Sequence, residues 1–208
     1  MKKVMIINYG NGNANSIKNA LTDLGAASVY SSKAIDIANA DYIILPGVGH
    51  HGSAMEALHD KGLIVALKEA VFVQHKPVLG ICLGMQLMTQ FSEESQLTGL
   101  GWVQAVTRKI VPGSKIQFKV PHVGWNIVSN EPSSVLLQGI PTADEPFYFC
   151  HGFAINAMAE PVVTSMVQYD KPYVALFERG NIFGVQFHPE KSQDSGLKLM
   201  QNFLSTGA

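Results

Sequence analysis

The sequence has little cysteine and lacks any long hydrophobic run near its start. Its 208 residues include two cysteines, Cys82 and Cys150, which are too few for a disulfide framework. The first apolar run, residues 4–7, follows Met1-Lys2-Lys3 and is too short for a signal peptide or a membrane span. These features exclude a disulfide-stabilised secreted scaffold and favour a protein of the reducing cytoplasm.

Charged residues are also scarce. They make up 15% of the chain, where about 25% is usual, and 15 Lys and Arg residues face 16 Asp and Glu residues. The formal net charge of −1 predicts no broad positive surface for nucleic acid or anionic lipid. Two explanations of the low charge remain open. Either a partner covers part of the surface, or a large core lies beneath a neutral polar surface.

Motifs for metals and nucleotide cofactors are incomplete. The adjacent pair His50-His51 cannot easily face one metal, and no His-Glu-x-x-His or Cys-x-x-Cys is present. Tyr9-Gly10-Asn11-Gly12-Asn13 lacks the third glycine of the dinucleotide fingerprint. Pro46-Gly47-Val48-Gly49 is not followed by the Lys-Ser or Lys-Thr of a phosphate loop, so its amides could instead serve an oxyanion. We expect no metal and no cofactor.

The first half of the chain alternates strand-like and helix-like segments. Apolar runs at residues 4–7, 42–45 and 77–81 each end at a turn or a small residue, and helical spacing of apolar residues covers 17–24 and 54–73. This order of short buried strands and helices predicts parallel strands covered by helices.

The second half is rich in β-branched and aromatic residues. Gly180-Asn181 separates two apolar runs and predicts a hairpin, and apolar residues within 197–204 predict a closing helix. Further strands are predicted at residues 102–110, 117–120, 147–155 and 162–168. We therefore expect one domain, residues 1–208, with a three-layer α/β fold. Its open, mixed but mostly parallel sheet carries helices on both faces, with the antiparallel strands late in the chain.

The strongest local motif is Gly80-Ile81-Cys82-Leu83-Gly84, between a predicted strand and a helix over 83–91. A nucleophile on such a sharp turn needs small neighbours on either side, as in the Gly-x-Ser-x-Gly elbow. The start of the helix favours a thiolate at Cys82, and the amide of Leu83 can donate to a developing oxyanion. The alternative is a buried core cysteine, which is common.

A cysteine nucleophile needs a base and a group that orients the base. Gln186-Phe187-His188-Pro189-Glu190 can supply both, because His188 follows a predicted strand and Glu190 lies two residues further on. The alternative is an exposed turn with an ordinary histidine. Together with the elbow, this motif predicts acyl transfer by Cys82, His188 and Glu190. His122 and His151 could line a pocket, although packing is the simpler role, and Cys150 is expected in the core.

These motifs together resemble those of the class I glutamine amidotransferases, a family with a flavodoxin-like fold. Three separated blocks carry the resemblance, residues 46–49, 80–86 and 186–192. More narrowly, the chain resembles the glutaminase subunits of imidazole glycerol phosphate synthase, from histidine biosynthesis. The motifs that favour this branch are Tyr9-Gly10-x-Gly12-Asn13, Leu45-Pro46-Gly47-Val48-Gly49, Met85-Gln86, Gly99-Leu100-Gly101-Trp102, Pro121-His122-Val123-Gly124-Trp125-Asn126 and His188-Pro189-Glu190-Lys191-Ser192.

The resemblance implies a reaction and a partner. Cys82 would attack the side-chain amide of L-glutamine, and His188, oriented by Glu190, would protonate the departing ammonia. Water would then hydrolyse the thioester to glutamate. The partner would be a (β/α)8 barrel synthase, a cyclase bound as a heterodimer. It would receive the ammonia through a sheltered path and form imidazole glycerol phosphate.

The resemblance also implies roles for other residues. The two oxyanion amides would belong to Val48 and Leu83. The amino-acid end of the substrate would be held by Gln86 and Glu94, with Gly49 beside it. The face toward the partner, or the ammonia path, would include Tyr9, Asn13, Pro121, Trp125, Tyr148 and Lys191.

Four residues depart from the family pattern, namely Asn8 for an aspartate, His50-His51 for a small residue and Phe, and Gly152 for a hydroxyl residue. None belongs to the predicted triad. They leave open a second acceptor, because relatives within this branch also supply synthases that amidinate nucleotide-linked sugars. A third hypothesis is a non-catalytic flavodoxin-like binding module with a structural Cys82.

Overall fold

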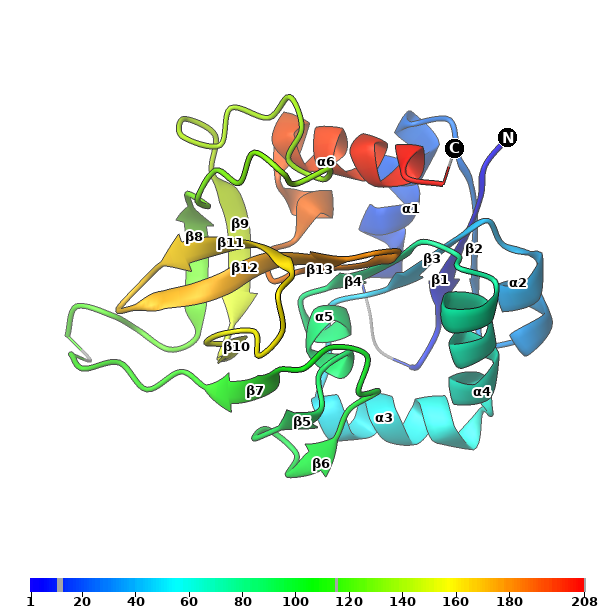
Figure 1. The fold of residues 1–208 in the computed structure, drawn as a ribbon, viewed down its shortest axis with the longest axis horizontal. Coiled ribbons are helices and arrows are strands. Elements are labelled where there is room, and N and C mark those ends of the chain that lie inside the picture. The colour runs from blue at the N-terminus through cyan, green and yellow to red at the C-terminus, as the bar shows by residue number, and fades with distance from the viewer. Residues whose placement is uncertain (11–12, 115, 208) are drawn as a thin grey trace.

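A computed structural model describes residues 1–10, 13–114 and 116–207 of the chain. Within these ranges, a seven-stranded sheet forms the centre of the molecule (Figure 1). Its strands, in spatial order, are β11 (Val163–Gln168), β12 (Pro172–Arg179), β13 (Ile182–Val185), β4 (Val78–Ile81), β3 (Tyr42–Leu45), β1 (Lys3–Ile7) and β2 (Ala27–Ser31). The strands from β13 to β2 pair in parallel, whereas β11, β12 and β13 pair antiparallel.

The central strands are short apolar runs because both faces of the sheet are covered. All four residues of β3, of β4 and of β13 are buried, as parallel strands between two helix layers require. The hairpin between β12 and β13 turns at Gly180, whose φ of 59° suits glycine. The mixed, mostly parallel sheet and its late antiparallel edge are therefore confirmed.

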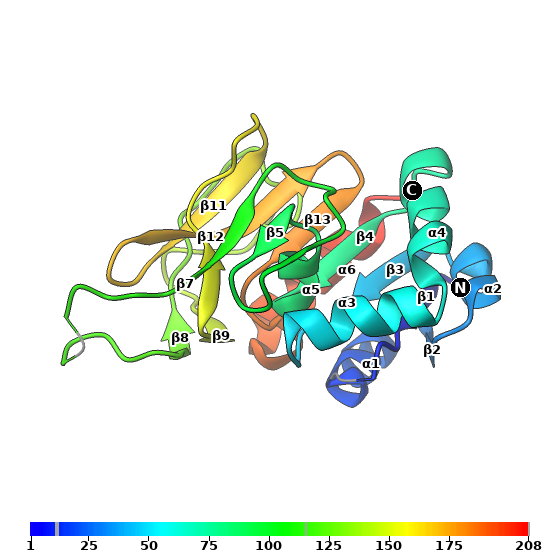
Figure 2. The same ribbon diagram turned by 90° about the horizontal axis from the view of Figure 1, so that it is seen from below.

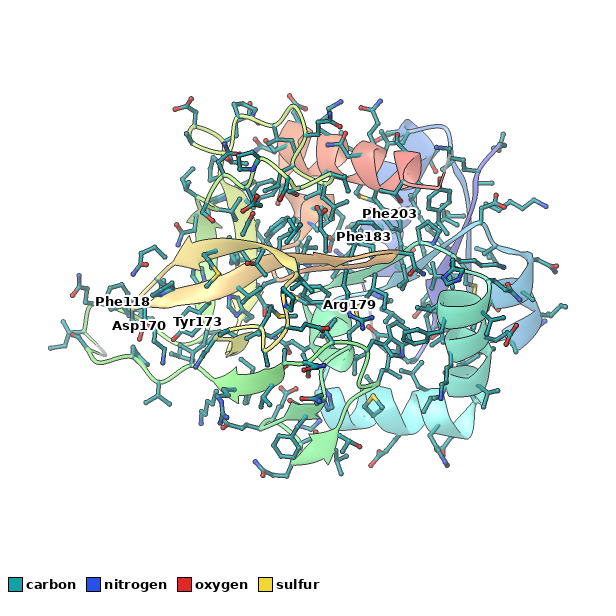
Figure 3. The ribbon with its side chains drawn as sticks, in the orientation of Figure 1. Phe118, Asp170, Tyr173, Arg179, Phe183 and Phe203 are labelled. Carbon is teal, nitrogen blue, oxygen red and sulfur yellow. The ribbon has the colours of Figure 1, made fainter. Side chains whose placement is uncertain are left out.

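Helices cover both faces of this sheet (Figure 1). One face carries α1 (Ala14–Asp23) and α6 (Gln193–Ser205). The other carries α2 (Ala34–Asn39), α3 (His51–Asp60), α4 (Leu63–Lys68) with its π-helical continuation η1 (Glu69–Val73), and α5 (Leu83–Leu87). Between the sheet and α6, Phe183 meets Phe203 edge to face, with ring centroids 5.8 Å apart (Figure 3). No described helix is long and apolar enough to cross a lipid bilayer.

Two small sheets lie against the antiparallel part of the central sheet, and the larger of them is on the side that carries α3 and α5 (Figure 1 and Figure 2). One consists of β10 (Phe153–Ile155), β7 (Val106–Lys109), β5 (Phe91–Ser92) and β6 (Leu97–Thr98). The other pairs β8 (His122–Asn126) with β9 (Phe147–His151) in antiparallel register. A short 3-10 helix, η2 (Pro189–Lys191), follows the central sheet and contacts β9. These sheets bring β9 next to the end of β13.

Several predicted elements differ from the structure. The predicted strand at 117–120 is absent from the described residues, and the strand begins after Pro121 instead. The helix predicted over 83–91 ends at Leu87, because the carbonyl groups of Leu87 and Met88 accept hydrogen bonds from the segment that follows β6. Sequence analysis does not identify β2 and α2, and Asn11 and Gly12 of the glycine-containing motif at 9–13 lie outside the described residues.

Candidate active site

Cys82 occupies a strained turn between β4 and α5. Its backbone has φ 47° and ψ −102°, a conformation that side-chain-bearing residues rarely adopt. The two flanking glycines are required by packing. A Cβ atom on Gly80 would lie 2.6 Å from the backbone of Gly84, and one on Gly84 would lie 2.0 Å from the carbonyl oxygen of Leu45. The predicted steric basis of the elbow is therefore confirmed.

His188 and Glu190 reach this turn from the end of β13 and from η2. The imidazole Nδ1 of His188 lies 2.9 Å from Oε1 of Glu190, and the two side chains are 3% and 1% exposed. Burial by itself would lower the pKa of His188, but hydrogen bonds to Cys82 and Glu190 outweigh it and raise this pKa to about 10. The contacts with Cys82 and Glu190 therefore favour the protonated form of the His188 imidazole.

The loop at residues 46–49 packs directly against both groups. A Cβ on Gly47 would lie 2.7 Å from the backbone carbonyl oxygen of Ile81, so only glycine fits there, and it would also lie 3.0 Å from Cβ of Cys82 and 3.1 Å from Cε1 of His188. Gly49 has a φ of 134°, which also favours glycine. The loop thus closes one side of the site without a side chain at its point of contact.

A cavity of about 300 Å³ opens beside the sulfur. It is lined by Gly47, Val48, Gly49, Cys82, Leu83, Gln86, Glu94, Cys150, His151, Gly152, Phe153, His188 and Lys191. The structure thus brings the residues predicted to bind substrate and oxyanion into one cavity with the predicted nucleophile and base. The carboxylate of Glu94 accepts a hydrogen bond of 2.8 Å from the backbone amide of His51, at the start of α3. Within the described ranges, no group of three or more His, Cys, Asp or Glu residues is arranged to hold a metal ion.

Tyr9 requires a correction. Its side chain is 2% exposed, so it offers no accessible surface to a partner, and its hydroxyl donates a hydrogen bond to the carbonyl oxygen of Pro46. Burial, followed by the negative charge of Cys82, raises its pKa well above the usual value, which keeps the phenol neutral. Tyr9 therefore supports the 46–49 loop from below. Tyr9 is predicted to face the partner or to line the ammonia path, and only the second role is compatible with this buried position.

The other predicted partner-facing residues include a cluster beside the site. Trp125 is 48% exposed, and its ring meets that of Tyr148 edge to face at 5.8 Å. The exposed Lys191 holds its ammonium 5.5 Å above the ring of Tyr148, which itself lies 6.5 Å from the ring of His188. Pro121 is exposed at the start of β8. This surface therefore adjoins the triad.

Among the described residues, the side-chain hydrogen bond of Asn13 is with α1 and not with the cluster of Trp125, Tyr148 and Lys191. It precedes α1, and its Oδ1 accepts a hydrogen bond of 3.0 Å from the hydroxyl of Ser16. Because α1 contacts η2, Asn13 lies at the beginning of a helix that also packs near the triad.

Sequence reasoning missed Gln186 and misplaced Cys150. Gln186 is fully buried, and its amide nitrogen lies 3.5 Å from the sulfur of Cys82. Its spacing of two residues from His188 is a usable signal, because alternate residues of an extended chain face the same side. Cys150 is exposed rather than part of the core, because in β9 its neighbours Phe149 and His151 take the buried positions.

His122 and His151 form a buried pair behind the cavity. The ring of His122 stacks on Phe149 and on Tyr169, at 4.9 and 4.1 Å between centroids. Nδ1 of His151 lies 2.8 Å from the carbonyl oxygen of Phe153, so it must donate, and Nε2 then accepts from Nδ1 of His122 at 3.1 Å. Burial is the main cause that lowers the pKa of His122 to about 4 and that of His151 to about 3.

This pair predicts an acid-sensitive fold. Below its ordinary pKa of about 6.5, each histidine binds a proton in the unfolded chain but not in the folded one. The free energy of unfolding should therefore fall as the pH falls from about 6.5 to about 4, by at most about 1.4 kcal/mol per pH unit for each group. In His122→Phe the change of the free energy of unfolding with pH, measured by denaturant unfolding at several pH values, should lose the contribution of one of the two histidines. The exposed His59→Gln should keep the original slope, and an unchanged slope in His122→Phe would refute the assignment.

Several known proteins are similar to this chain in sequence or in fold. The family described as "Glutamine amidotransferase class-I" matches residues 5–206. The chain therefore belongs to the class I glutamine amidotransferases. Within them it belongs with the HisH subunits. It is 41% identical over 209 residues to "Imidazole glycerol phosphate synthase subunit HisH 2" of Nitrobacter winogradskyi, with 98% of each chain covered. It is 39% identical over 201 residues to the HisH 2 subunit of Methanococcus maripaludis, covering 97% of this chain and 98% of that protein.

Solved structures support the same fold at lower sequence identity. PurLQS of Thermotoga maritima superimposes with a TM-score of 0.71 at 19% identity, covering 98% of this chain and 97% of that one. A glutamine amidotransferase superimposes with a TM-score of 0.76 at 18% identity, covering 98% of each chain. These likenesses concern the fold alone.

Proposed function

We propose that the chain is the glutaminase subunit of an imidazole glycerol phosphate synthase of histidine biosynthesis. It hydrolyses L-glutamine to glutamate and ammonia through Cys82, His188 and Glu190. The observation that carries the proposal is that Cys82 and His188 line one cavity of about 300 Å³, with Nδ1 of the His188 imidazole held 2.9 Å from Oε1 of the buried Glu190. Membership of the HisH group supports the pathway.

The mechanism follows from the protonation states in the site. The thiolate of Cys82 attacks the carboxamide carbon of glutamine, and the carbonyl oxygen becomes an oxyanion. Nδ1 of His188 is held by Glu190, so Nε2 is left to give its proton to the departing ammonia. The thioester is then hydrolysed by water, with the neutral imidazole as base and proton carrier. The oxyanion is stabilised by the amide of Leu83, which at the start of α5 has no partner within the helix, and by that of Val48.

The substrate's amino-acid end is held by Gln86 and Glu94, beside Gly49. Both hydrogens of the Gln86 amide are used inside the protein, at 2.9 Å from the carbonyl oxygen of Phe153 and 3.1 Å from Oε1 of Gln186. Gln86 therefore has only its oxygen to offer a ligand. An amide oxygen and the Glu94 carboxylate together suit the ammonium group of glutamine.

The exposed cluster of Trp125, Tyr148 and Lys191 belongs to the surface that binds a (β/α)8 barrel cyclase, in a cytoplasmic heterodimer with the single domain 1–208. Its position next to His188 supports this role. Free ammonia in neutral water is almost wholly protonated and is then no nucleophile, so a covered path from Cys82 to the partner preserves its reactivity. The 46–49 loop, with its two glycines, gates the reaction by completing the oxyanion site in the complex.

The test is glutamine hydrolysis by the purified chain alone and in complex with the barrel synthase and its acceptor nucleotide. We expect the isolated chain to be about 10²–10³-fold slower, because one oxyanion donor is worth about that factor. Equal rates would reject gating, and no hydrolysis by the complex would reject the function. Rescue of a histidine auxotroph lacking this subunit tests the pathway. Failure of rescue with intact hydrolysis would assign the ammonia to another acceptor.

A further inference from the structure

The side chain of Gln186 lies against the reactive sulfur. Its Nε2 is 3.5 Å from Sγ of Cys82, and the residue has no exposed surface. Gln186 follows β13 and precedes His188 by two residues, so both side chains point to the same side of the chain toward the elbow. The sulfur therefore has a second polar neighbour besides the imidazole.

A chain of hydrogen bonds fixes which end of the Gln186 amide faces the sulfur. The carbonyl oxygen of Phe153 can only accept, so the group of Gln86 that lies 2.9 Å from it is the NH₂ group. The same NH₂ group lies 3.1 Å from the side chain of Gln186 and must there meet an oxygen. The remaining NH₂ group of Gln186 then points at Cys82.

We propose that Gln186 is a catalytic residue that donates a hydrogen bond to the sulfur of Cys82 and stabilises its thiolate. This inference rests on the proposed glutaminase function and deepens it. Hydrogen bonds to a charged acceptor are stronger than neutral ones, and more so in a buried site. The carbonyl oxygen of Cys150, 3.8 Å from the sulfur, accepts a hydrogen bond from the neutral thiol and so favours the uncharged form. A donor from Gln186 offsets this preference when the thiolate forms.

Gln186 and His188 differ in what they can do during turnover. The imidazolium gives its proton to ammonia, so it becomes a neutral base when the thioester forms. An amide does not lose its proton at physiological pH, so the donor from Gln186 stays on the sulfur throughout. It therefore stabilises the thiolate both before attack and when hydrolysis of the thioester releases the sulfur again.

The test is the pH dependence of Cys82 alkylation by a neutral reagent such as iodoacetamide, in a Cys150→Ser background that removes the exposed thiol. Gln186→Met keeps the size of the side chain but removes the donor. The pH of half-maximal alkylation should rise by about one unit, which makes alkylation about tenfold slower below it. The other ionisable groups around the cavity, His151, His188, Glu94 and Lys191, are unchanged in this comparison.

Gln201→Met is the matched control, because it makes the same substitution on the exposed face of α6, away from the sulfur. Its alkylation midpoint should stay in place. The double variant Gln86→Met/Gln186→Met should match Gln186→Met, and it also avoids the unpaired Gln86 amide that could unfold the single variant. A midpoint unmoved by Gln186→Met, or moved equally by Gln201→Met, would overturn the proposal. Since alkylation needs no glutamine, a complex that fails to hydrolyse glutamine would instead refute the proposed function.

Discussion

Cys82→Ala should abolish glutamine hydrolysis by the complex while ammonia-fed synthesis by the barrel partner continues. The thiolate is the only group of the proposed mechanism that forms a bond to the substrate, and loss of a triad nucleophile elsewhere costs about 10⁶-fold in kcat. Alanine removes one sulfur atom from a residue that is 6% exposed, so the surrounding backbone keeps its shape. Glutamate release, and product formation with an ammonium salt in place of glutamine, measure the two activities separately.

The second cysteine supplies the control for this experiment. Cys150 lines the same cavity, and its backbone carbonyl oxygen lies 3.8 Å from the sulfur of Cys82, but its own side chain on β9 is exposed. Cys150→Ala should retain glutaminase activity within a few-fold. Retained hydrolysis in Cys82→Ala would refute the mechanism. Loss of ammonia-fed synthesis as well would indicate that the complex no longer assembles.

The sequence predicts the framework of the site because the framework depends on local patterns. Apolar runs buried on both faces become β3, β4 and β13. Of the glycines around Cys82, Gly84 reflects packing against the nearby strand β3, and Gly80 reflects packing against the start of α5. The approach of His188 to Cys82 is a long-range contact, yet it is predictable. Two parallel neighbouring strands end at the same edge of a sheet, and β4 and β13 pair in parallel.

The parts that sequence reasoning missed depend on contacts that no local pattern encodes. Tyr9 is next to a turn in sequence, but the 46–49 loop covers it. Cys150 has apolar neighbours, but in β9 it faces away from the packed side that Phe149 and His151 occupy. The orientation of Gln186 depends on a hydrogen bond from Gln86 that in turn depends on the carbonyl group of Phe153. The Tyr9 and Gln186 cases each depend on how segments that are distant in sequence pack together.

The carboxylate of Glu190 has a role that its amide cannot replace. One oxygen, Oε1, accepts from Nδ1 of His188, and Oε2 is buried without a hydrogen-bond partner among the described residues. In Glu190→Gln the NH₂ group either occupies the Oε2 position, where a buried donor without a partner costs about 1–3 kcal/mol, or turns toward Nδ1. In the second case Nδ1 must accept a hydrogen bond. The imidazole is then neutral, with its single proton on Nε2, instead of the imidazolium that carries a proton on both nitrogens.

Glu190→Gln should therefore lower kcat by about 10²–10⁴-fold, as in other triads with the wrong tautomer. It also removes one of the groups that raise the pKa of His188 to about 10. A raised histidine pKa stabilises the fold fully below the unfolded value of about 6.5, and this contribution is lost as the pH rises toward 10. The stability difference between the wild type and the variant, measured by denaturant unfolding, should accordingly be largest below about pH 6.5 and fade toward pH 10. Glu93→Gln, which changes a surface partner of Arg108, should leave kcat unchanged. Near-normal turnover in Glu190→Gln would remove this carboxylate from the mechanism, and the charge on His188 would then have to be sustained by Cys82 alone.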